Sequence, residues 1–333
     1  MKQNSTRVLL ALVTVLVILL VGCNRGEEST VRKITIAQFG DFFLYAPLYV
    51  AIDEGYFRDM GLEVSLISTG GDDKTWAAVL AGNAAFGVAD PTFVAIAGTK
   101  GQPGTVIANI VDGVPFWGVT YNDEIPLITD ATLLRGYSVA TFPSPSTAFT
   151  LQSKMFRDAS LEPKIREGAF GTLLTMAQTN QADIALELEP NVSQAAKGGA
   201  RVLYSMRDLY GPFAVTGVTT TPKIVAGEPD LVRAVDCALQ KALDLLHSQQ
   251  SKALVHLKKR FPEISEDVAK AALERIVAGS IIPASLETTG KSWATATNLR
   301  IATGDLQVTT PVDSYIDNSF ARETLSRSEC RLN

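Results

Sequence analysis

The sequence predicts an α/β protein with two sheet-containing units, each a mixed, mainly parallel sheet flanked by helices, followed by a helical tail. Three observations predict this class. β-rich and helix-periodic segments alternate from Val31 to Tyr121, as in sheets whose parallel strands are joined by helices. The alternation restarts near Tyr137 and continues to Thr220. From Glu228 onward the pattern is mainly helical. Two such units predict two lobes, with a ligand cleft where the strand ends face each other.

In the first unit, apolar alternation and β-branched residues indicate strands, and apolar periodicity indicates helices. Pro47 opens the first helix, which Gly61 ends, because proline suits a first turn and glycine a helix end. The expected strands are 31–38, 62–68, 84–89, 106–111 and 115–121, and the expected helices are 47–60, 74–81 and one starting at Pro91.

In the second unit the same criteria apply, and the turn at 143–146 leads into a helix that ends near Arg157. The expected strands are 137–142, 165–170, 182–187, 200–204 and 214–220, and the other expected helices are 172–179 and one starting at Pro190. We therefore expect residues 31–117 and 216–333 to form lobe 1 and residues 118–215 to form lobe 2.

The amino end carries Lys2 and Arg7, followed by an apolar run from Val8 to Val21 that would span roughly 21 Å as a helix. This is too short to cross a bilayer and is typical of a secretory signal. Leu20-Val21-Gly22-Cys23 resembles the lipobox of bacterial lipoproteins. That resemblance implies a signal peptide at 1–22, a lipid on Cys23, a flexible tether at 23–30 and a membrane-anchored protein of the cell envelope. An uncleaved membrane anchor is the alternative.

Composition excludes several classes of protein. The 333 residues carry a net charge of −5 with no basic block, which argues against nucleic-acid binding. Two histidines and three cysteines are scattered along the chain, which argues against a Cys/His metal site and a dense disulfide scaffold. We expect a monomer with no cofactor and no metal. Whether Cys237 and Cys330 pair is left open by the sequence.

Several segments resemble the solute-binding components of nitrate, sulfonate, taurine and thiamine-pyrimidine ABC importers, the NMT1/THI5-like family. The segments are Tyr45 to Ala51, Glu54 to Phe57, Gly61 to Val64, Leu80 to Val88, Leu134 to Val139 and Gln181 to Ala185. The resemblance implies the two-lobed, type II periplasmic-binding-protein fold. It also implies capture of a small molecule by hinge closure and delivery to an ABC permease and its ATPase, without covalent chemistry.

Aromatic residues crowd the loop after the first strand, where a ligand would bind. Phe39, Phe42, Phe43 and Tyr45 lie within seven residues, together with Asp41. Exposing so much apolar surface calls for a ligand, although core packing would explain some of these rings. Trp117, at the first crossing between the units, is a further aromatic candidate.

Polar candidates follow the other strands at the same edges. Backbone N–H groups at helix starts bind acceptor groups, although each polar residue there would also serve as a plain helix cap. The candidates are Gly71, Asp72, Asp90, Thr92 and Asp112 in the first unit and Ser144, Ser146 and Thr147 in the second.

Glu187 and Glu189 end a second-unit strand, two residues apart and so on one face. Carboxylates there would repel an anion, whereas a flat nitrogen heterocycle would stack on the aromatic rings and donate N–H groups to them. The sequence therefore favours a pyrimidine-type ligand, such as a vitamin precursor. A nitrate, alkyl sulfonate or taurine carrier and a ligand-binding sensor are the alternatives. An enzyme is not expected, because His247 and His256 both lie in the helical tail and no nucleophile pairs with them in the pattern.

Overall fold

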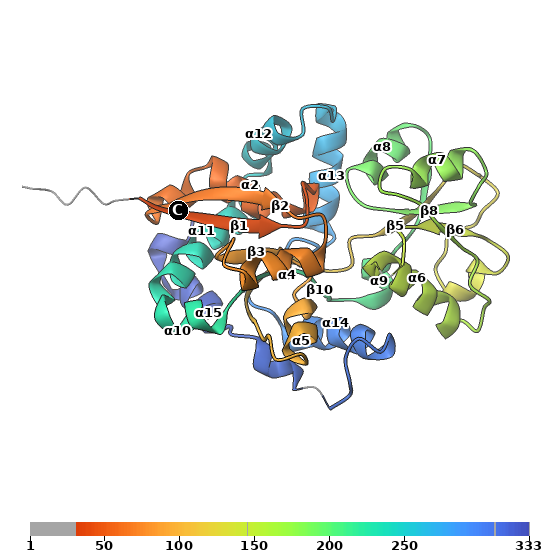
Figure 1. Cartoon of the computed structure of the whole chain (residues 1–333). Coiled ribbons are helices and arrows are strands. Elements are labelled where there is room, and N and C mark those ends of the chain that lie inside the picture. Colours follow the sequence, from red (N-terminus) through yellow and green to blue (C-terminus); the bar gives the residue numbers. More distant parts are fainter. Residues whose placement is uncertain (1–30, 145, 310, 333) are drawn as a thin grey trace, which may run out of the picture. The chain divides into compact units, whose positions relative to one another are not determined.

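Two five-stranded sheets organise the part of the chain that the computed structural model describes, residues 31–144, 146–309 and 311–332. The chain divides into Met1–Arg32 and Lys33–Asn333, and the second part contains both sheets except for Arg32, the first residue of β1. Helices surround each sheet (Figure 1). The predicted signal peptide, tether and lipidation site Cys23 lie outside the described residues. Among the described residues, no helix is long and apolar enough to cross a bilayer.

The first sheet has the strand order β2-β1-β3-β10-β4. Strands β1 and β3 are parallel, and β10 runs antiparallel between β3 and β4. The strands are β1 (Arg32–Gln38), β2 (Leu62–Ser68), β3 (Phe86–Ala89), β4 (Thr105–Asp112) and β10 (Ala214–Thr220). All of β3 and the interior of β4 are buried, as expected of strands covered on both faces.

The second sheet has the order β7-β6-β8-β5-β9. Strands β6, β7 and β8 are parallel, whereas β5 runs antiparallel to both β8 and β9. The strands are β5 (Trp117–Thr120), β6 (Val139–Thr141), β7 (Ile165–Glu167), β8 (Ile184–Glu187) and β9 (Arg201–Ser205). Both sheets are thus mixed, and the predicted fold class is confirmed. The exact lobe limits at 117/118 and 215/216 stay a prediction.

Helices connect and cover the strands. The α-helices are α2 (Ala46–Asp53), α3 (Tyr56–Asp59), α4 (Asp72–Leu80), α5 (Thr92–Gly98), α6 (Thr147–Asp158), α7 (Leu173–Gln178), α8 (Asn191–Lys197), α9 (Met206–Tyr210), α10 (Pro222–Gly227), α11 (Pro229–Ser248), α12 (Gln250–Arg260), α13 (Glu266–Ala278), α14 (Gly290–Ala302) and α15 (Ser319–Ser326). Short 3-10 turns lie at η1 (Phe43–Tyr45), η2 (Ala131–Leu134), η3 (Val312–Tyr315) and η4 (Ser328–Cys330).

The predicted helix at 47–60 is two helices in the structure. Pro47 lies in the first turn of α2, as predicted, but α2 ends at Asp53 and α3 begins at Tyr56. Gly55 between them has φ = 80°, a left-handed conformation that glycine adopts without steric cost. Apolar periodicity continues across this break, so periodicity alone did not reveal it.

The helical tail packs against the first sheet and reaches the second. Helix α11 contacts α2, α3 and α15, and it carries a buried stripe that includes Leu239, Leu243 and Leu246. Helix α13 packs against α8, the helix that connects strands β8 and β9 of the second sheet (Figure 1). A disulfide joins Cys237 in α11 to Cys330 in η4, with an S–S distance of 2.09 Å. It fastens the C-terminal segment to the longest helix of the tail.

Candidate functional site

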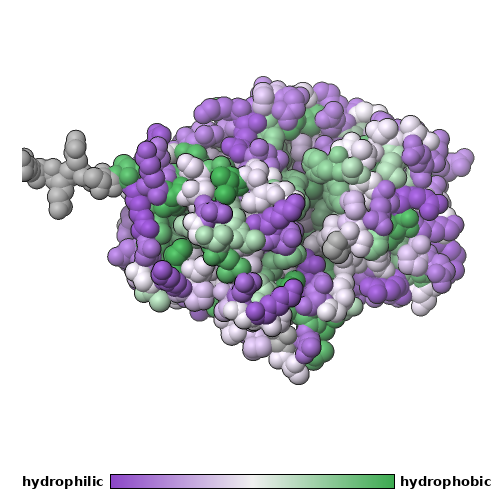
Figure 2. Space-filling model, in the orientation of Figure 1, coloured by the Kyte–Doolittle hydropathy of each residue, from purple (hydrophilic) through white to green (hydrophobic). Residues whose placement is uncertain are grey.

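A cavity of about 890 Å³ is lined by residues that follow strands of both sheets. One wall comes from the loop after β1, the start of α4 and the turn after β3. The facing wall comes from the loop after β6, the start of α6 and the loop after β7. Figure 2 shows pale green, weakly hydrophobic surface in the region between the β1–β3 side and the β5–β8 side of the molecule. The strand ends of both sheets therefore converge on one site, as the fold class predicts.

Phenylalanine rings form a continuous chain across the cavity wall. Phe42, from the loop after β1, meets Phe170, from the loop after β7, edge to face at 5.7 Å between ring centroids. Phe170 stacks on Phe142 at 5.8 Å, and Phe142 lies 6.2 Å from Phe116. Phe39 extends the chain on the other side of Phe42, at 5.3 Å. Phe170 is 62% exposed, which is costly for so large an apolar ring unless a ligand covers it.

The cavity lining also includes acidic side chains and a buried ion pair. The Nη2 of Arg300 lies 2.7 Å from the carboxylate of Asp90, and its Nε donates to the hydroxyl of Thr92. The other carboxylate oxygen of Asp90 accepts hydrogen bonds from the backbone N–H and hydroxyl of Thr92. The backbone N–H of Asp90 in turn donates to the carboxylate of Asp72, at 2.9 Å. Asp72, Asp90 and Arg300 all line the cavity.

Burial changes the ionisation of this group. Removal from water and the neighbouring Asp90 carboxylate raise the pKa of Asp72 to about 7. Burial also raises the pKa of the Tyr45 phenol well above its ordinary value, and the charge of Asp72 adds to that effect. Tyr45 is therefore neutral, and Asp72 changes charge near neutral pH.

Asp41 joins the cavity to the helical tail. Its carboxylate accepts from the side-chain amide of Gln38, at 2.8 Å, and pairs with the Arg260 guanidinium of α12. Arg260 also lies over the ring of Tyr49, 4.0 Å from its centroid. Although partial burial acts in the other direction, these bonds lower the pKa of Asp41. The loop that carries Phe39 and Phe42 is thus held by both its own strand and α12.

Of the candidates named from sequence, nine line the cavity. They are Phe39, Asp41, Phe42, Tyr45, Gly71, Asp72, Asp90, Ser146 and Thr147. The Ser146 hydroxyl also caps α6, by accepting from the N–H of Phe149, so the capping interpretation holds there as well. Whether these residues bind a ligand stays a prediction.

Two predicted aromatic contacts lie in the core instead of the cavity wall. Phe43 is only 2% exposed and packs against Phe261, 5.6 Å between centroids. Trp117 is 4% exposed and lies inside β5, between strands β8 and β9. Both rings are part of the hydrophobic core, which for Phe43 was the alternative explanation.

The two predicted glutamate acceptors are also placed elsewhere. Glu187 is fully buried and accepts from the backbone N–H of Leu188 and the amide of Asn191. Glu189 is buried against Ser193 and pairs with Arg275 of α13, at 2.5 Å. Burial raises the pKa of both carboxyl groups. The inferred acidic strand end therefore does not line the cavity.

Three polar candidates lie outside the cavity lining. Thr92 binds Asp90 and Arg300 but does not line the cavity. Asp112 accepts from the Asn109 amide at 2.8 Å, and its pKa is raised by burial. The backbone N–H of Ser144 donates to Glu167, at 2.8 Å. Their polar groups thus have partners within the protein.

Sequence reasoning missed Arg300, Phe116, Phe142 and Phe170. Arg300 comes from the helical tail, 210 positions from its partner Asp90, and nothing local marks it. The three phenylalanines lie at the ends of the expected strands 115–121, 137–142 and 165–170, and in the structure the shorter strands β5, β6 and β7 leave them in loops. The sequence pattern placed them inside strands, so it did not mark them as cavity residues.

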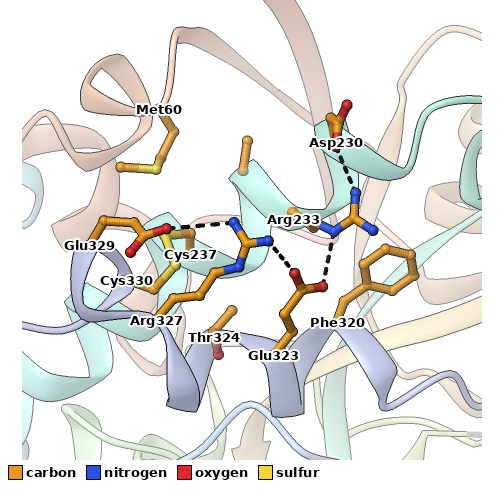
Figure 3. A pocket seen from close by; sticks show the side chains of 11 residues that line it. Met60, Asp230, Arg233, Cys237, Phe320, Glu323, Thr324, Arg327, Glu329 and Cys330 are labelled. Atoms are coloured by element: carbon orange, nitrogen blue, oxygen red, sulfur yellow. Dashed lines mark hydrogen bonds and ion pairs between the residues drawn. A yellow bond between two sulfur atoms is a disulfide. The ribbon is translucent and has the colours of Figure 1, made fainter.

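A second cavity, of about 240 Å³, lies beside the disulfide (Figure 3). Arg233 bridges Asp230 and Glu323, and Arg327 bridges Glu323 and Glu329. Both arginines are thus occupied by the three carboxylates, so this cavity offers a ligand little beyond a solvated ion-pair network. Within the described chain, no cluster of three or more His, Cys, Asp or Glu side chains is arranged to hold a metal ion.

Comparison with known proteins assigns the family. The model of the family described as NMT1/THI5 like matches residues 43–253. The chain belongs to this family. The match runs from the aromatic loop after β1 into α12 and includes most of the cavity wall.

Solved structures share the fold at low sequence identity. The aliphatic sulphonate-binding protein SsuA of Escherichia coli aligns with a TM-score of 0.68 and 17% identity, covering 86% of this chain and 92% of that one. The nitrate-binding protein NrtA of Synechocystis PCC 6803 aligns with a TM-score of 0.67 and 16% identity, covering 88% of each chain. The predicted periplasmic-binding-protein fold is therefore confirmed.

A curated relative matches over a short stretch. It is described as the putative binding protein YtlA of Bacillus subtilis (strain 168), and it is 41% identical over 54 residues. The match spans 16% of each chain.

Proposed function

We propose that the protein is an exported, lipid-anchored solute receptor that delivers a flat nitrogen heterocycle, such as a pyrimidine-type vitamin precursor, to an ABC importer. The observation that carries this proposal is the chain of phenylalanine rings, contributed by loops of both sheets, along one cavity. Aromatic rings arranged in this way offer a flat ligand stacking and edge contacts from two sides. Closure of the two lobes, each built on one of the sheets, around the ligand would complete the site.

The polar groups of the cavity fit the same ligand class. Asp72 and Asp90 are hydrogen-bond acceptors, which a ring N–H or amino group would satisfy. Since Glu187 and Glu189 have partners elsewhere in the protein, we assign these aspartates the acceptor role that the sequence suggested for the two glutamates.

A nitrate or sulfonate receptor is the second candidate, because the Arg300 guanidinium lines the cavity. SsuA and NrtA, which share the fold, are described as binding proteins for aliphatic sulphonate and nitrate. Against an anion, Arg300 is already paired with Asp90, and three further aspartates line the same cavity.

Binding without chemistry is supported by the position of the histidines. His247 lies near the carbonyl of Pro283 and His256 binds Glu54, and neither lines the cavity. The Cys237–Cys330 disulfide fits an oxidising compartment outside the cytoplasm.

The test is to identify small molecules that co-purify with the protein, followed by calorimetric titration with aminopyrimidines, flavins, nitrate and alkyl sulfonates. Phe142→Ala and Phe170→Ala should each weaken heterocycle binding roughly 5- to 150-fold, the effect of losing about 1–3 kcal/mol of ring packing. Leu127→Ala is the matched control, because Leu127 is exposed and lies outside the cavity. Tight binding of nitrate or a sulfonate, with no response to any heterocycle, would favour the second candidate.

A further inference from the structure

The described side chains that line the cavity carry more negative than positive charge. Among the described residues that line it, the charged ones are the aspartates at 41, 72, 73 and 90 and a single arginine, Arg300. Asp41 is paired with Arg260, and Asp90 is paired with Arg300. Within the described chain, neither Asp72 nor Asp73 forms an ion pair. Asp73 is exposed to water, whereas Asp72 is partly buried.

Arg300 is not available to neutralise a second carboxylate fully. Its Nη2 and Nε are bonded to Asp90 and Thr92, and its Nη1 lies 3.5 Å from Asp305. Its guanidinium also lies over the ring of Phe93, at 5.2 Å. These four contacts fix the guanidinium plane against the turn after β3, so Arg300 attracts Asp72 only at longer range.

Among the described residues, Asp72 has one hydrogen-bond partner, the backbone N–H of Asp90. A carboxylate accepts several hydrogen bonds, so Asp72 retains acceptor capacity at the cavity wall. The other groups whose charges act on it are Asp90 from the turn after β3, Asp73 from α4 and Arg300 from α14, and Tyr45 of η1 lies close enough for its phenol to feel the charge of Asp72.

We propose that Asp72 determines the class of ligand: a planar aromatic molecule that carries a positively charged N–H group, such as an amidinium or protonated amine, whose charge pairs with Asp72 while its rings lie among the phenylalanines. This inference rests on the proposed function and names the charge of its ligand. A cationic N–H group of the ligand would be the positively charged partner of the Asp72 carboxylate, joined to it by a charge-assisted hydrogen bond. An anion of the same shape would meet an uncompensated carboxylate.

The experiment uses three probes of nearly identical shape: 2-naphthamidine, 2-naphthamide and 2-naphthoate. They differ mainly in charge, so their affinities for the full chain at pH 8 report the charge preference of the cavity. We expect naphthamidine to bind most tightly, and naphthoate at least roughly tenfold more weakly than naphthamidine. Asp72→Asn should weaken naphthamidine roughly tenfold or more and leave naphthamide within about threefold, because asparagine still accepts from the Asp90 N–H.

Asp123→Asn is the control, because it removes one negative charge from an exposed loop outside the cavity. It should leave all three affinities unchanged. The ranking of the three probes on the unmodified protein needs no variant, so a folding defect in Asp72→Asn would not obscure the result. Equal or tighter binding of naphthoate would overturn the charge inference while leaving an aromatic ligand in place. If none of the three binds but nitrate or a sulfonate does, the proposed function itself fails.

Discussion

Asp72 links binding to pH, because its pKa is raised to about 7 by burial and by Asp90. A cationic ligand pairs with the ionised carboxylate, so the ligand-bound protein has a lower Asp72 pKa than the free protein. Binding therefore releases a proton near neutral pH, and affinity rises as the pH rises through the free-protein value.

We expect the affinity for 2-naphthamidine, which stays protonated throughout, to increase roughly 30-fold between pH 5.5 and pH 8. Calorimetry in buffers of different ionisation enthalpy should show proton release at pH 6.5, and Asp72→Asn should abolish both the release and the pH dependence. A pH-independent affinity in the unmodified protein would contradict this assignment of the acceptor.

At the residue scale, the sequence predicted those parts of the site that depend on local position. Phe39, Phe42 and Asp72 lie in or just after loops that follow strands, and strand ends converge in this fold class. It did not predict Arg300, because that side chain reaches Asp90 from the far end of the chain. It also misplaced Trp117 and Glu187, since a residue at a strand end can face the core as readily as the cavity.

Two ion pairs that no local sequence pattern reveals join helix α13 to helix α8 and to the residues just before it. Glu189, whose side chain is fully buried, pairs with Arg275 of α13, and Lys197 of α8 pairs with Asp267 at 2.7 Å. Removing Arg275 would leave Glu189 buried without its cation, with Ser193 as its remaining partner among the residues that the structure describes.

Arg275→Ala should therefore lower the free energy of unfolding by about 3–5 kcal/mol, measured by urea denaturation. The double variant Glu189→Leu with Arg275→Ala should recover much of that loss, because the unpaired charge is gone. Lys197→Ala is a suitable comparison, since its exposed pair with Asp267 should contribute no more than about 1 kcal/mol. An Arg275→Ala variant as stable as the parent would show that Glu189 is satisfied without it.

The disulfide holds the last elements, η4 and α15, against α11. Cys237 and Cys330 are 93 positions apart, so the crosslink restricts a long segment of the unfolded chain. Replacing both cysteines with alanine should lower the free energy of unfolding by about 2–4 kcal/mol. Thermal unfolding with and without a reductant measures the same effect, and alkylation mass spectrometry should find both thiols blocked in the native protein. Free thiols in protein exported by its host would refute the pairing.

At the scale of the whole molecule, the strand–helix alternation was sufficient to predict two mixed sheets and a helical tail. It succeeded because buried strands and amphipathic helices leave local patterns of hydrophobicity. The break at Gly55 and the packing of α13 on α8 were not predictable in this way. Both depend on backbone conformation or on contacts between elements distant in sequence, and neither changes the local pattern.

The last prediction concerns how the protein is held at a membrane. The apolar run before Cys23 is too short to span, and the described part of the chain has no helix that could replace it. If acyl chains on Cys23 are the anchor, Cys23→Ser should abolish incorporation of a labelled fatty acid and release the protein from membranes of a host that processes lipoproteins. The variant in which Cys237 and Cys330 become serine is the control, since it removes thiols but should keep the label. A Cys23→Ser protein that still sediments with membranes would mean that the uncleaved amino end is the anchor.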